Sequence, residues 1–255
     1  MKAVIEEEGI ETKEVLLKSY PEVVVQQIKN LEGNKLVEAG FIITYYEKEK
    51  IFLEVLSTYN ESESKYETIA YINYEYDEKN RINKVYTSLD KYNTFVIFID
   101  VYEYSDDKSL ELKKIKKYEK TGYNNPTSIT EQATLSEITT FKYNSKGVVN
   151  YEHDEMEEIV YKNYKFDKRG YLLNKEMFME KLHVGNMSYS YNTRNLIDSI
   201  EVKAVNGTIF KRYDYMYTDI NGSNLIHWNK RDINNIIFNK EMYKEYIEKI
   251  NSLKF

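Results

Sequence analysis

Few side chains in this sequence are of the types that bind metal ions or attack substrates as nucleophiles. The 255 residues include no cysteine and only three histidines, His153, His183 and His227. The histidines lie far apart in the chain and share no short spacing that would bring two imidazoles to one metal ion. Without cysteine there are no disulfides, thiolate metal sites or cysteine nucleophiles. We therefore expect no metal ion and no cofactor.

The 42 aspartate and glutamate residues are the remaining candidates for acid–base chemistry. His153 lies in the acidic run 152–158, where carboxylates would raise its pKa or share a cation with it, although a solvated strand end is the favoured interpretation. Five other acids are interpreted as turn caps rather than calcium ligands: Asp77, Asp106, Asp107, Asp167 and Asp219. A carboxylate pair for glycoside hydrolysis stays an open alternative, because no pair stands out. We assign no catalytic residue and favour a protein without enzymatic activity.

Aromatic residues are the side chains most open to a role in binding. Tyrosine occurs 26 times, and the densest stretch contains Tyr213, Tyr215 and Tyr217, followed by Trp228. Such rings stack on sugars or anchor protein interfaces when they lie on an exposed surface. We name these four as candidate binding residues, and the favoured alternative is that the rings form the core of a sheet.

The aromatic residues belong to a degenerate repeat of about 25 residues, which must position them. Each copy has two aromatics separated by one residue, then an Asx-rich turn and an aliphatic residue. The aromatic pairs are Tyr74/Tyr76, Tyr102/Tyr104, Phe141/Tyr143, Tyr164/Phe166, Tyr189/Tyr191 and Tyr215/Tyr217. Aromatics at i and i+2 share one face of a strand, Asx side chains cap turns, and Gly or Asn tolerates positive φ. The predicted structural turn residues are Asp77, Asn144, Gly147, Asp167, Gly170, Asn192, Asn206, Gly207 and Gly222.

The spacing of the repeat predicts the fold class. The second aromatics stand at positions 76, 104, 143, 166, 191 and 217, which are 28, 39, 23, 25 and 26 residues apart. Two strands of roughly ten residues with their turns need about this length. We predict a mainly β protein, an elongated twisted antiparallel sheet of repeated hairpins with short helices at the termini. About 14 strands spaced about 4.8 Å apart give a sheet roughly 65 Å long, which curls partly around a partner without sealing a cavity.

The chain shows no shift in composition that would separate two domains. We expect an N-terminal cap region over residues 1–40, helical or mixed, in which residues 12–30 form short helices or a first strand. The sheet of repeated hairpins then covers residues 41–232. Residues 233–255 form a C-terminal helix or a last strand pair in the same domain, because the apolar residues there follow a helical spacing.

The repeat unit resembles the tyrosine–aspartate (YD) repeat of Rhs proteins, Tc-toxin shells and teneurins, including its short orphan bacterial relatives. The resemblance covers residues 66–231 and is best at Tyr76-Asp77, Tyr143-Asn144, Phe166-Asp167 and Tyr191-Asn192. The segment 219–231 is similar to the Gly-Asn-Trp-x-Lys-Arg element that ends such chains, with an insertion. The resemblance implies antiparallel sheets that wrap around a cargo, and hence a binding or scaffold role. The self-cleaving aspartyl-protease core sequence of Rhs proteins is absent here.

Charge and hydropathy narrow the choice of partner. The net charge of −6 argues against a nucleic-acid backbone, and no window is apolar enough for a membrane span. We favour a non-enzymatic binding or scaffold protein that engages a macromolecular partner, as an immunity or chaperone-like partner of a secreted effector or toxin. The alternative is a cell-surface protein that binds or processes carbohydrate. As the sequence stands, without an apolar leader, we expect a cytoplasmic protein, and an extracytoplasmic one if a signal peptide has been removed.

Overall fold

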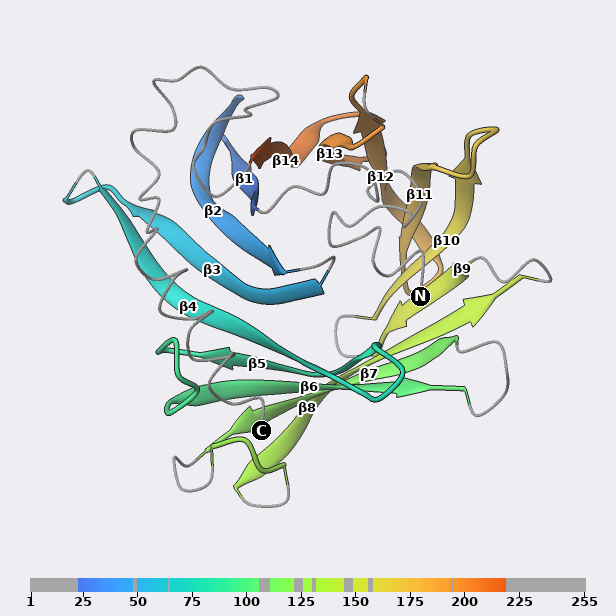
Figure 1. Ribbon diagram of the computed structural model, residues 1–255. Helices are drawn as coiled ribbons and strands as arrows, with labels where there is room; N and C mark the ends of the chain where they lie inside the picture. Colours follow the sequence, from blue (N-terminus) through green and yellow to red (C-terminus); the bar gives the residue numbers. More distant parts are fainter. Residues whose placement is uncertain are drawn as a thin grey trace.

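The described part of the chain is a closed antiparallel β-barrel, in which each strand pairs with the next and β1 pairs with β14 (Figure 1). The computed structural model describes residues 23–47, 50–63, 65–105, 111–121, 126–129, 132–144, 149–155, 158–193 and 195–218. The 14 strands in these ranges are β1 (Val23–Glu32), β2 (Lys35–Glu47), β3 (Lys50–Asn60), β4 (Lys65–Tyr76), β5 (Ile82–Ser88), β6 (Val96–Tyr104), β7 (Leu112–Lys120), β8 (Ala133–Tyr143), β9 (Val149–Asp154), β10 (Ile159–Phe166), β11 (Leu172–Met179), β12 (Leu182–Tyr191), β13 (Ile197–Ala204) and β14 (Ile209–Thr218). None of the described ranges contains a helix long and apolar enough to cross a membrane.

The prediction of a mainly β protein made of antiparallel hairpins is confirmed. The expected open, elongated sheet is instead closed, because β1 and β14 form an eight-pair ladder from Val23↔Thr218 to Asn30↔Lys211. Pairing the first and last strands removes both edges of the sheet, which would otherwise present unpaired backbone groups. Residues 23–40, expected within the cap region, lie in β1, β2 and the turn between them, and Val23 is the first residue that the structure describes. Residues 233–255 lie outside the described residues.

The connections between strands alternate between the two ends of the barrel, since consecutive strands are antiparallel neighbours. The Asx turns of the repeat follow β4, β10 and β12 and lie at one end, which we call the repeat-turn end. The start of β1 and the end of β14 lie there too. The opposite end, which we call the hairpin end, carries the connections that follow β1, β11 and β13.

Three of the turns at the repeat-turn end share one hydrogen-bond pattern. The backbone N–H of Asp77, Asp167 and Asn192 donates to the carbonyl oxygen four residues later, at 2.8 Å in each turn. The side-chain Oδ1 of each residue accepts from the backbone N–H of that same later residue, at 2.9, 3.0 and 3.1 Å. An Asx side chain at this position therefore satisfies backbone donors that the turn leaves unpaired.

Positive φ angles occur where the repeat places Gly or Asn. Three residues after the capping Asx stand Asn80, Gly170 and Asn195, with φ of 60°, 95° and 61°. At the hairpin end, Gly207 has φ 85°, and the Asn206 side chain accepts the N–H of Thr208 at 3.0 Å. Asn144 directly follows β8, whereas Gly147 and Gly222 lie outside the described residues.

The second tyrosine of several repeat units bonds the neighbouring strand. Its hydroxyl donates to a backbone carbonyl at or next to the start of the strand before it. The bonds are Tyr76 to Ile51 at 2.7 Å, Tyr104 to Ile82 at 2.8 Å, Tyr191 to Leu172 at 2.8 Å and Tyr217 to Ile197 at 2.9 Å. Each bond therefore links two neighbouring strands at the repeat-turn end, whereas the turn that joins the same two strands lies at the hairpin end.

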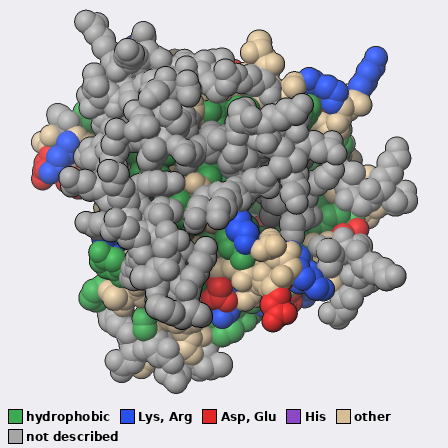
Figure 2. Space-filling view, in the orientation of Figure 1, with side chains coloured by type: hydrophobic (Ala, Val, Ile, Leu, Met, Phe, Trp, Pro, Cys, Tyr) green, Lys and Arg blue, Asp and Glu red, His purple; other side chains and the backbone are tan. Residues whose placement is uncertain are grey.

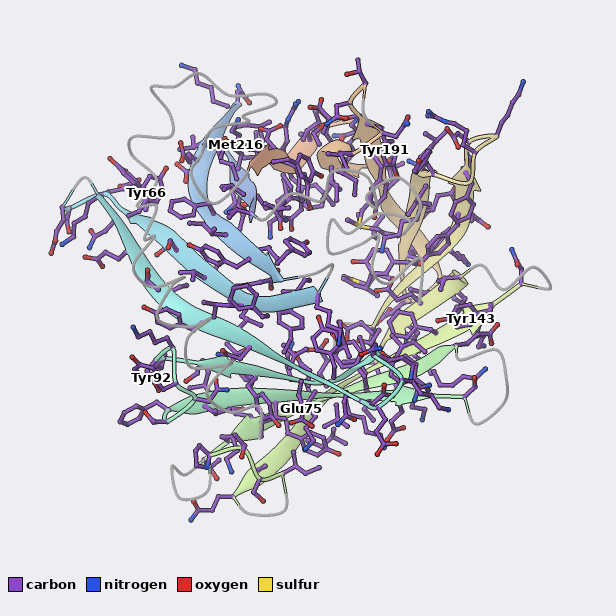
Figure 3. All side chains as sticks on the ribbon, viewed as in Figure 1. Tyr66, Glu75, Tyr92, Tyr143, Tyr191 and Met216 are labelled. Carbon is purple, nitrogen blue, oxygen red and sulfur yellow. The ribbon has the colours of Figure 1, made fainter. Side chains whose placement is uncertain are left out.

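Many side chains of the described strands project into the barrel (Figure 3), and one cluster of buried residues lies near the repeat-turn end. This cluster packs Tyr46 and Ile51, from β2 and β3, against residues of β11 to β14. Val24 of β1 belongs to the same cluster and connects the two groups, because β1 pairs with both β2 and β14. The cluster consists of Val24, Tyr46, Ile51, Leu172, Tyr189, Leu196, Ile197, Ile200, Tyr215 and Tyr217.

Candidate functional site

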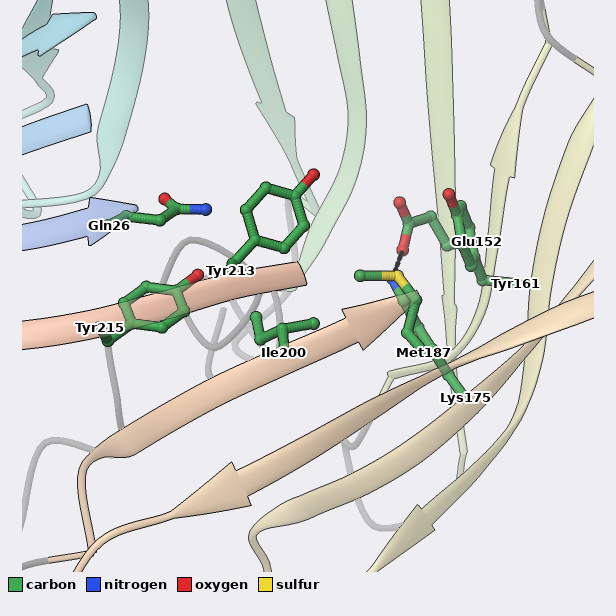
Figure 4. A pocket seen from close by; sticks show the side chains of 8 residues that line it. All are labelled: Gln26, Glu152, Tyr161, Lys175, Met187, Ile200, Tyr213 and Tyr215. Atoms are coloured by element: carbon green, nitrogen blue, oxygen red, sulfur yellow. Dashed lines mark hydrogen bonds and ion pairs between the residues drawn. The ribbon is translucent and has the colours of Figure 1, made fainter. Parts of the chain in front are cut away.

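A cavity of about 190 Å³ lies in the barrel interior beside this apolar cluster (Figure 4). Seven neighbouring strands, β9 to β14 and β1, contribute its lining. The lining residues are Gln26, Glu152, Tyr161, Lys175, Met187, Ile200, Tyr213 and Tyr215. Both apolar surface and groups able to form hydrogen bonds thus face one space.

The register of the sheet explains why these residues meet. Residues directly opposite each other in an antiparallel pair project from the same face. The lining consists of four such pairs, Glu152 with Tyr161, Lys175 with Met187, Ile200 with Tyr213 and Gln26 with Tyr215. The site is therefore built from inward-facing positions of the strands, not from loops, and the rigid ladder fixes its geometry.

A buried ion pair forms the polar centre of the cavity. The Nζ atom of Lys175 lies 3.1 Å from Oε2 of Glu152, and the lysine side chain is only 2% exposed. The hydroxyl of Tyr164 donates to the same Oε2 at 3.2 Å. Lys175 Nζ also lies 3.9 Å from the centroid of the Tyr161 ring, a cation–π distance. The carboxylate and the amine are thus held by specific neighbours.

Burial shifts the protonation of both members of this pair. Desolvation raises the pKa of Glu152 to about 7, against the hydrogen bond from Tyr164, which lowers it. Desolvation also holds the pKa of Lys175 well below its ordinary value. The attraction across 3.1 Å and the Tyr161 ring favour the charged forms instead. The pair therefore lies near the balance between an ion pair and a neutral pair that shares one proton.

Tyr189 adds a hydroxyl next to this pair. Burial first, and then the charge of Glu152, raise its pKa well above the ordinary value, so the group stays protonated. Its hydroxyl oxygen is buried and has no hydrogen-bond partner within the described part of the chain. An unpaired buried hydroxyl is costly, and Tyr189 is not among the residues that line the cavity.

A second charge group lies farther around the barrel, on β6 to β8, and its Lys117 and Glu137 side chains are 35% and 29% exposed. Lys117 Nζ is 2.9 Å from Glu137 Oε2, and Asp100 stands opposite Lys117 in the register. Burial raises the pKa of Asp100 to about 6, against the attraction of Lys117. Burial lowers the pKa of Lys117, but the hydrogen bond to Glu137 and the charge of Asp100 outweigh it and raise that pKa overall. Lys117, in contrast to Lys175, is therefore held as an ammonium ion.

The candidate binding residues named from the sequence fall into three groups. Tyr213 and Tyr215 line the cavity. Tyr217 is buried in the apolar cluster, with its hydroxyl bonded to the backbone of Ile197. Trp228 lies outside the described residues.

The sequence analysis missed Gln26, Glu152, Tyr161 and Lys175 as members of the site. Glu152 lies in the acidic run that was considered for His153, and its neighbour His153 alternates to the other side of β9. Lys175 had one usable signal, since it is a charged residue two positions from Met177 on the same face of β11. None of these residues forms a local motif, because each strand supplies one.

The histidines do not come together at a metal site in the part of the chain that the structure describes. His153 pairs with Val160 on β10, and the His183 ring lies 5.2 Å from the Phe178 ring. His227 lies outside the described residues. Among the described residues, no group of three or more His, Cys, Asp or Glu side chains is placed to hold a metal ion.

Comparisons by sequence identify no relatives: no protein-family model matches the chain, and no curated protein matches it. Among solved structures, a porin-like protein from Bacteroides uniformis is similar, with a TM-score of 0.38 and 10% identity over 77% of this chain and 96% of that one. The Photorhabdus luminescens Tc holotoxin pore is also similar, with a TM-score of 0.25 and 11% identity over 71% of this chain. The TcdB2–TccC3 structure without its hypervariable C-terminal region gives a TM-score of 0.24 and 14% identity over 67% of this chain.

All three similarities are weak. The match spans only 11% and 10% of the two Tc toxin chains. Tc toxin chains are thus present among the weak structural neighbours, but no family model assigns the chain to a YD-repeat family.

Proposed function

We propose that the chain is a non-enzymatic binding protein that holds a carbohydrate, or one sugar unit of a larger glycan, in the Glu152–Lys175 cavity. The observation that carries the proposal is the convergence of a carboxylate, an amine, an amide and three tyrosines from five strands on one cavity. A ligand rich in hydroxyl groups would bond to the carboxylate, the amine and the amide. The aromatic rings would contact its apolar face.

The size of the cavity limits the ligand to about one ring. A volume of about 190 Å³ leaves room for several water molecules. This is below the roughly 300 to 1,000 Å³ of sites for drug-sized ligands. A monosaccharide unit fits this limit, and a longer glycan would place only one unit in the cavity.

The lining favours binding over hydrolysis. Glycoside hydrolysis ordinarily uses two carboxyl groups that flank the scissile bond. The residues that line the cavity include one carboxylate, Glu152, and its nearest charged partner is Lys175. This arrangement supports a role in recognition.

The test is calorimetric titration of the purified protein with a panel of monosaccharides and their methyl glycosides. Glu152→Gln should weaken binding by about tenfold or more, because a hydrogen bond to a charged group contributes about 1.5 to 3 kcal/mol. Glu176→Gln is the matched control, since Glu176 lies on β11, two strands from Glu152, and accepts a hydrogen bond from Asn163 at an exposed position. No binding across the panel, or equal binding by both variants, would contradict the proposal.

A second candidate is a basic protein partner, such as a secreted effector or toxin, bound at the hairpin end. Leu182 and Val205 are 71% and 61% exposed, and they lie at the neighbouring tips of β11–β12 and β13–β14. The net charge of −6 favours a basic partner, and acidic and basic side chains lie among apolar ones on the described surface in Figure 2. A partner purified from the native lysate should rebind the wild-type protein and Glu176→Gln but not Leu182→Ser. If the partner is an effector, we expect this protein in the cytoplasm. If the ligand is a cell-surface carbohydrate, we expect it outside the cytoplasm.

A further inference from the structure

Lys175 combines three features that a reactive amine requires. Its side chain is buried, it lines a cavity large enough for a small ligand, and Nζ lies 3.1 Å from a carboxyl group. Desolvation lowers its pKa, which increases the fraction of neutral amine with a free electron pair. Glu152 is equally unusual, because burial raises its pKa to about 7, where it both gives and takes protons near neutral pH.

We propose that Lys175 forms a reversible imine with an aldehyde group of a small ligand held in the cavity. The inference rests on the proposed function, because it uses the same cavity and narrows the ligand to molecules with a carbonyl group. The open-chain form of a reducing sugar and a short hydroxyaldehyde both carry this group.

The geometry supplies both proton transfers of the reaction. The Nζ electron pair forms a bond to the carbonyl carbon, and the carbonyl oxygen takes a proton from Glu152 while the new ammonium returns one to it. Glu152 then protonates the hydroxyl, the carbon–oxygen bond breaks and water leaves. The product is a protonated imine paired with the Glu152 carboxylate. One aldehyde, one neutral amine and one carboxylic acid thus give an iminium, a carboxylate and one water.

The groups around Lys175 suit this product. The charge of the iminium would lie against Glu152 from β9 and over the ring of Tyr161 from β10, as Nζ does now at 3.1 and 3.9 Å. The Tyr164 hydroxyl donates to Glu152 and would hold the carboxylate in place. Met187 of β12 lines the adjoining wall and adds no charge, while burial and the charge of Glu152 keep Tyr189 protonated.

Lys117 provides a matched control within the same barrel. It also projects into the interior, but it pairs with Glu137 at 2.9 Å and stands opposite Asp100. These carboxylates raise its pKa, so its electron pair is bound to a proton. Lys117 should therefore remain unreactive where Lys175 reacts.

The experiment traps the imine in the folded protein. The protein is incubated with glyceraldehyde and cyanoborohydride at neutral pH, and peptide mass mapping gives the rate of adduct formation at each lysine. We expect Lys175 to react at least about tenfold faster than Lys117, and Glu152→Gln to slow it by about tenfold or more, since proton transfer by a positioned group contributes roughly 10² to 10⁴ in rate. Lys175→Met should lose the fast adduct while keeping the circular dichroism spectrum of the wild-type protein.

Closed-ring ligands separate this inference from the proposed function. A methyl glycoside has no free aldehyde, so it binds the cavity without forming an imine. Glycoside binding with slow labelling of Lys175 would overturn the imine and leave the proposed function standing. Fast labelling of Lys175 without glycoside binding would support the imine and overturn the sugar-ring ligand. Lys175 labelling no faster than Lys117 in the folded wild-type protein overturns the inference in every case.

Discussion

Removing Lys175 should make the stability of the barrel strongly dependent on pH. In Lys175→Met, Glu152 keeps its buried position but loses the amine that lies 3.1 Å away. The carboxyl group then remains in the folded state chiefly in its neutral form. Its folded pKa should be at least the value of about 7 that burial produces in the wild-type protein, compared with about 4.3 in an unfolded chain.

The direction and size of the effect follow from proton linkage. Between pH 4.3 and pH 7 the folded variant holds a proton that the unfolded chain has released, so its stability falls as the pH rises. Each unit of this interval corresponds to about 1.4 kcal/mol. From pH 5 to pH 8 the free energy of unfolding of Lys175→Met should therefore fall by about 3 kcal/mol through Glu152 alone.

The measurement is urea denaturation followed by circular dichroism at pH 5 and pH 8. The double variant Lys175→Met/Glu152→Gln is the control, because it lacks the titrating group but keeps a side chain of the same size. Other groups, such as Asp100 with its pKa of about 6, contribute equally to both variants. If both variants lose the same stability between pH 5 and pH 8, Glu152 is not the buried, proton-binding group that this reasoning requires.

Three further predictions concern a buried tyrosine, a turn glycine and the carboxyl group of Asp100. Tyr217→Phe removes the hydrogen bond to the Ile197 carbonyl and should lower the free energy of unfolding by about 1 to 2 kcal/mol in urea denaturation, whereas Tyr59→Phe, at an exposed position, should change it by less than about 0.5 kcal/mol. Gly207→Ala places a side chain at φ 85° and should lower the free energy of unfolding by about 1 kcal/mol. Gly207→Asn should lower it less, because Asn tolerates this conformation, and thermal unfolding of the two variants measures the difference. Because the pKa of Asp100 is raised to about 6 in the folded state, the wild-type protein loses stability as the pH rises through this value. Asp100→Asn lacks this group, so its free energy of unfolding should increase relative to that of the wild type between pH 5 and pH 8. If the difference between the two proteins is the same at both pH values, the raised pKa is contradicted.

The hairpin repeat could be predicted because its signals are local. An aromatic pair, an Asx cap and a residue able to adopt positive φ lie within about ten residues, and each acts on its own turn. In the turn that begins at Asp167, the cap and Gly170 occupy the positions that the sequence indicates. The length of the repeat also predicted about 14 strands, and the described part of the chain contains 14.

Closure of the barrel could not be predicted in the same way. It depends on β1 pairing with β14, whose residues lie at the far end of the described chain, from Val23↔Thr218 onward. The alternation of residues shows which face of a strand is apolar, but it does not identify the partner strand. The run Val23-Val24-Val25 suits a strand, and it is equally compatible with the short helix considered for residues 12–30.

The site was hidden by its distribution and by irregularities in the strands. A pattern of strict alternation places Tyr161 and Tyr164 on opposite faces of β10. The register shifts between Lys162 and Lys165, where Asn163 has φ 58°. As a result both rings face Lys175, at 3.9 and 5.9 Å from Nζ. A bulge of this kind reverses the face of every residue beyond it, so the inward-facing set is not readable from spacing alone.

The two aromatics of the repeat have different roles, and this difference bears on how such a barrel acquires a binding site. Hydroxyls at the second position of four repeat units bond backbone carbonyls, as Tyr191 does with Leu172, and so link neighbouring strands of the wall. Two hydroxyls at the first position bond carboxylates, Tyr74 with Glu54 at 2.7 Å and Tyr164 with Glu152 at 3.2 Å, whereas that of Tyr189 has no hydrogen-bond partner in the described part of the chain. The first set therefore fixes acids inside the barrel, where burial changes their pKa. Because the second set maintains the wall independently, the interior can differ in its charged residues without loss of the fold.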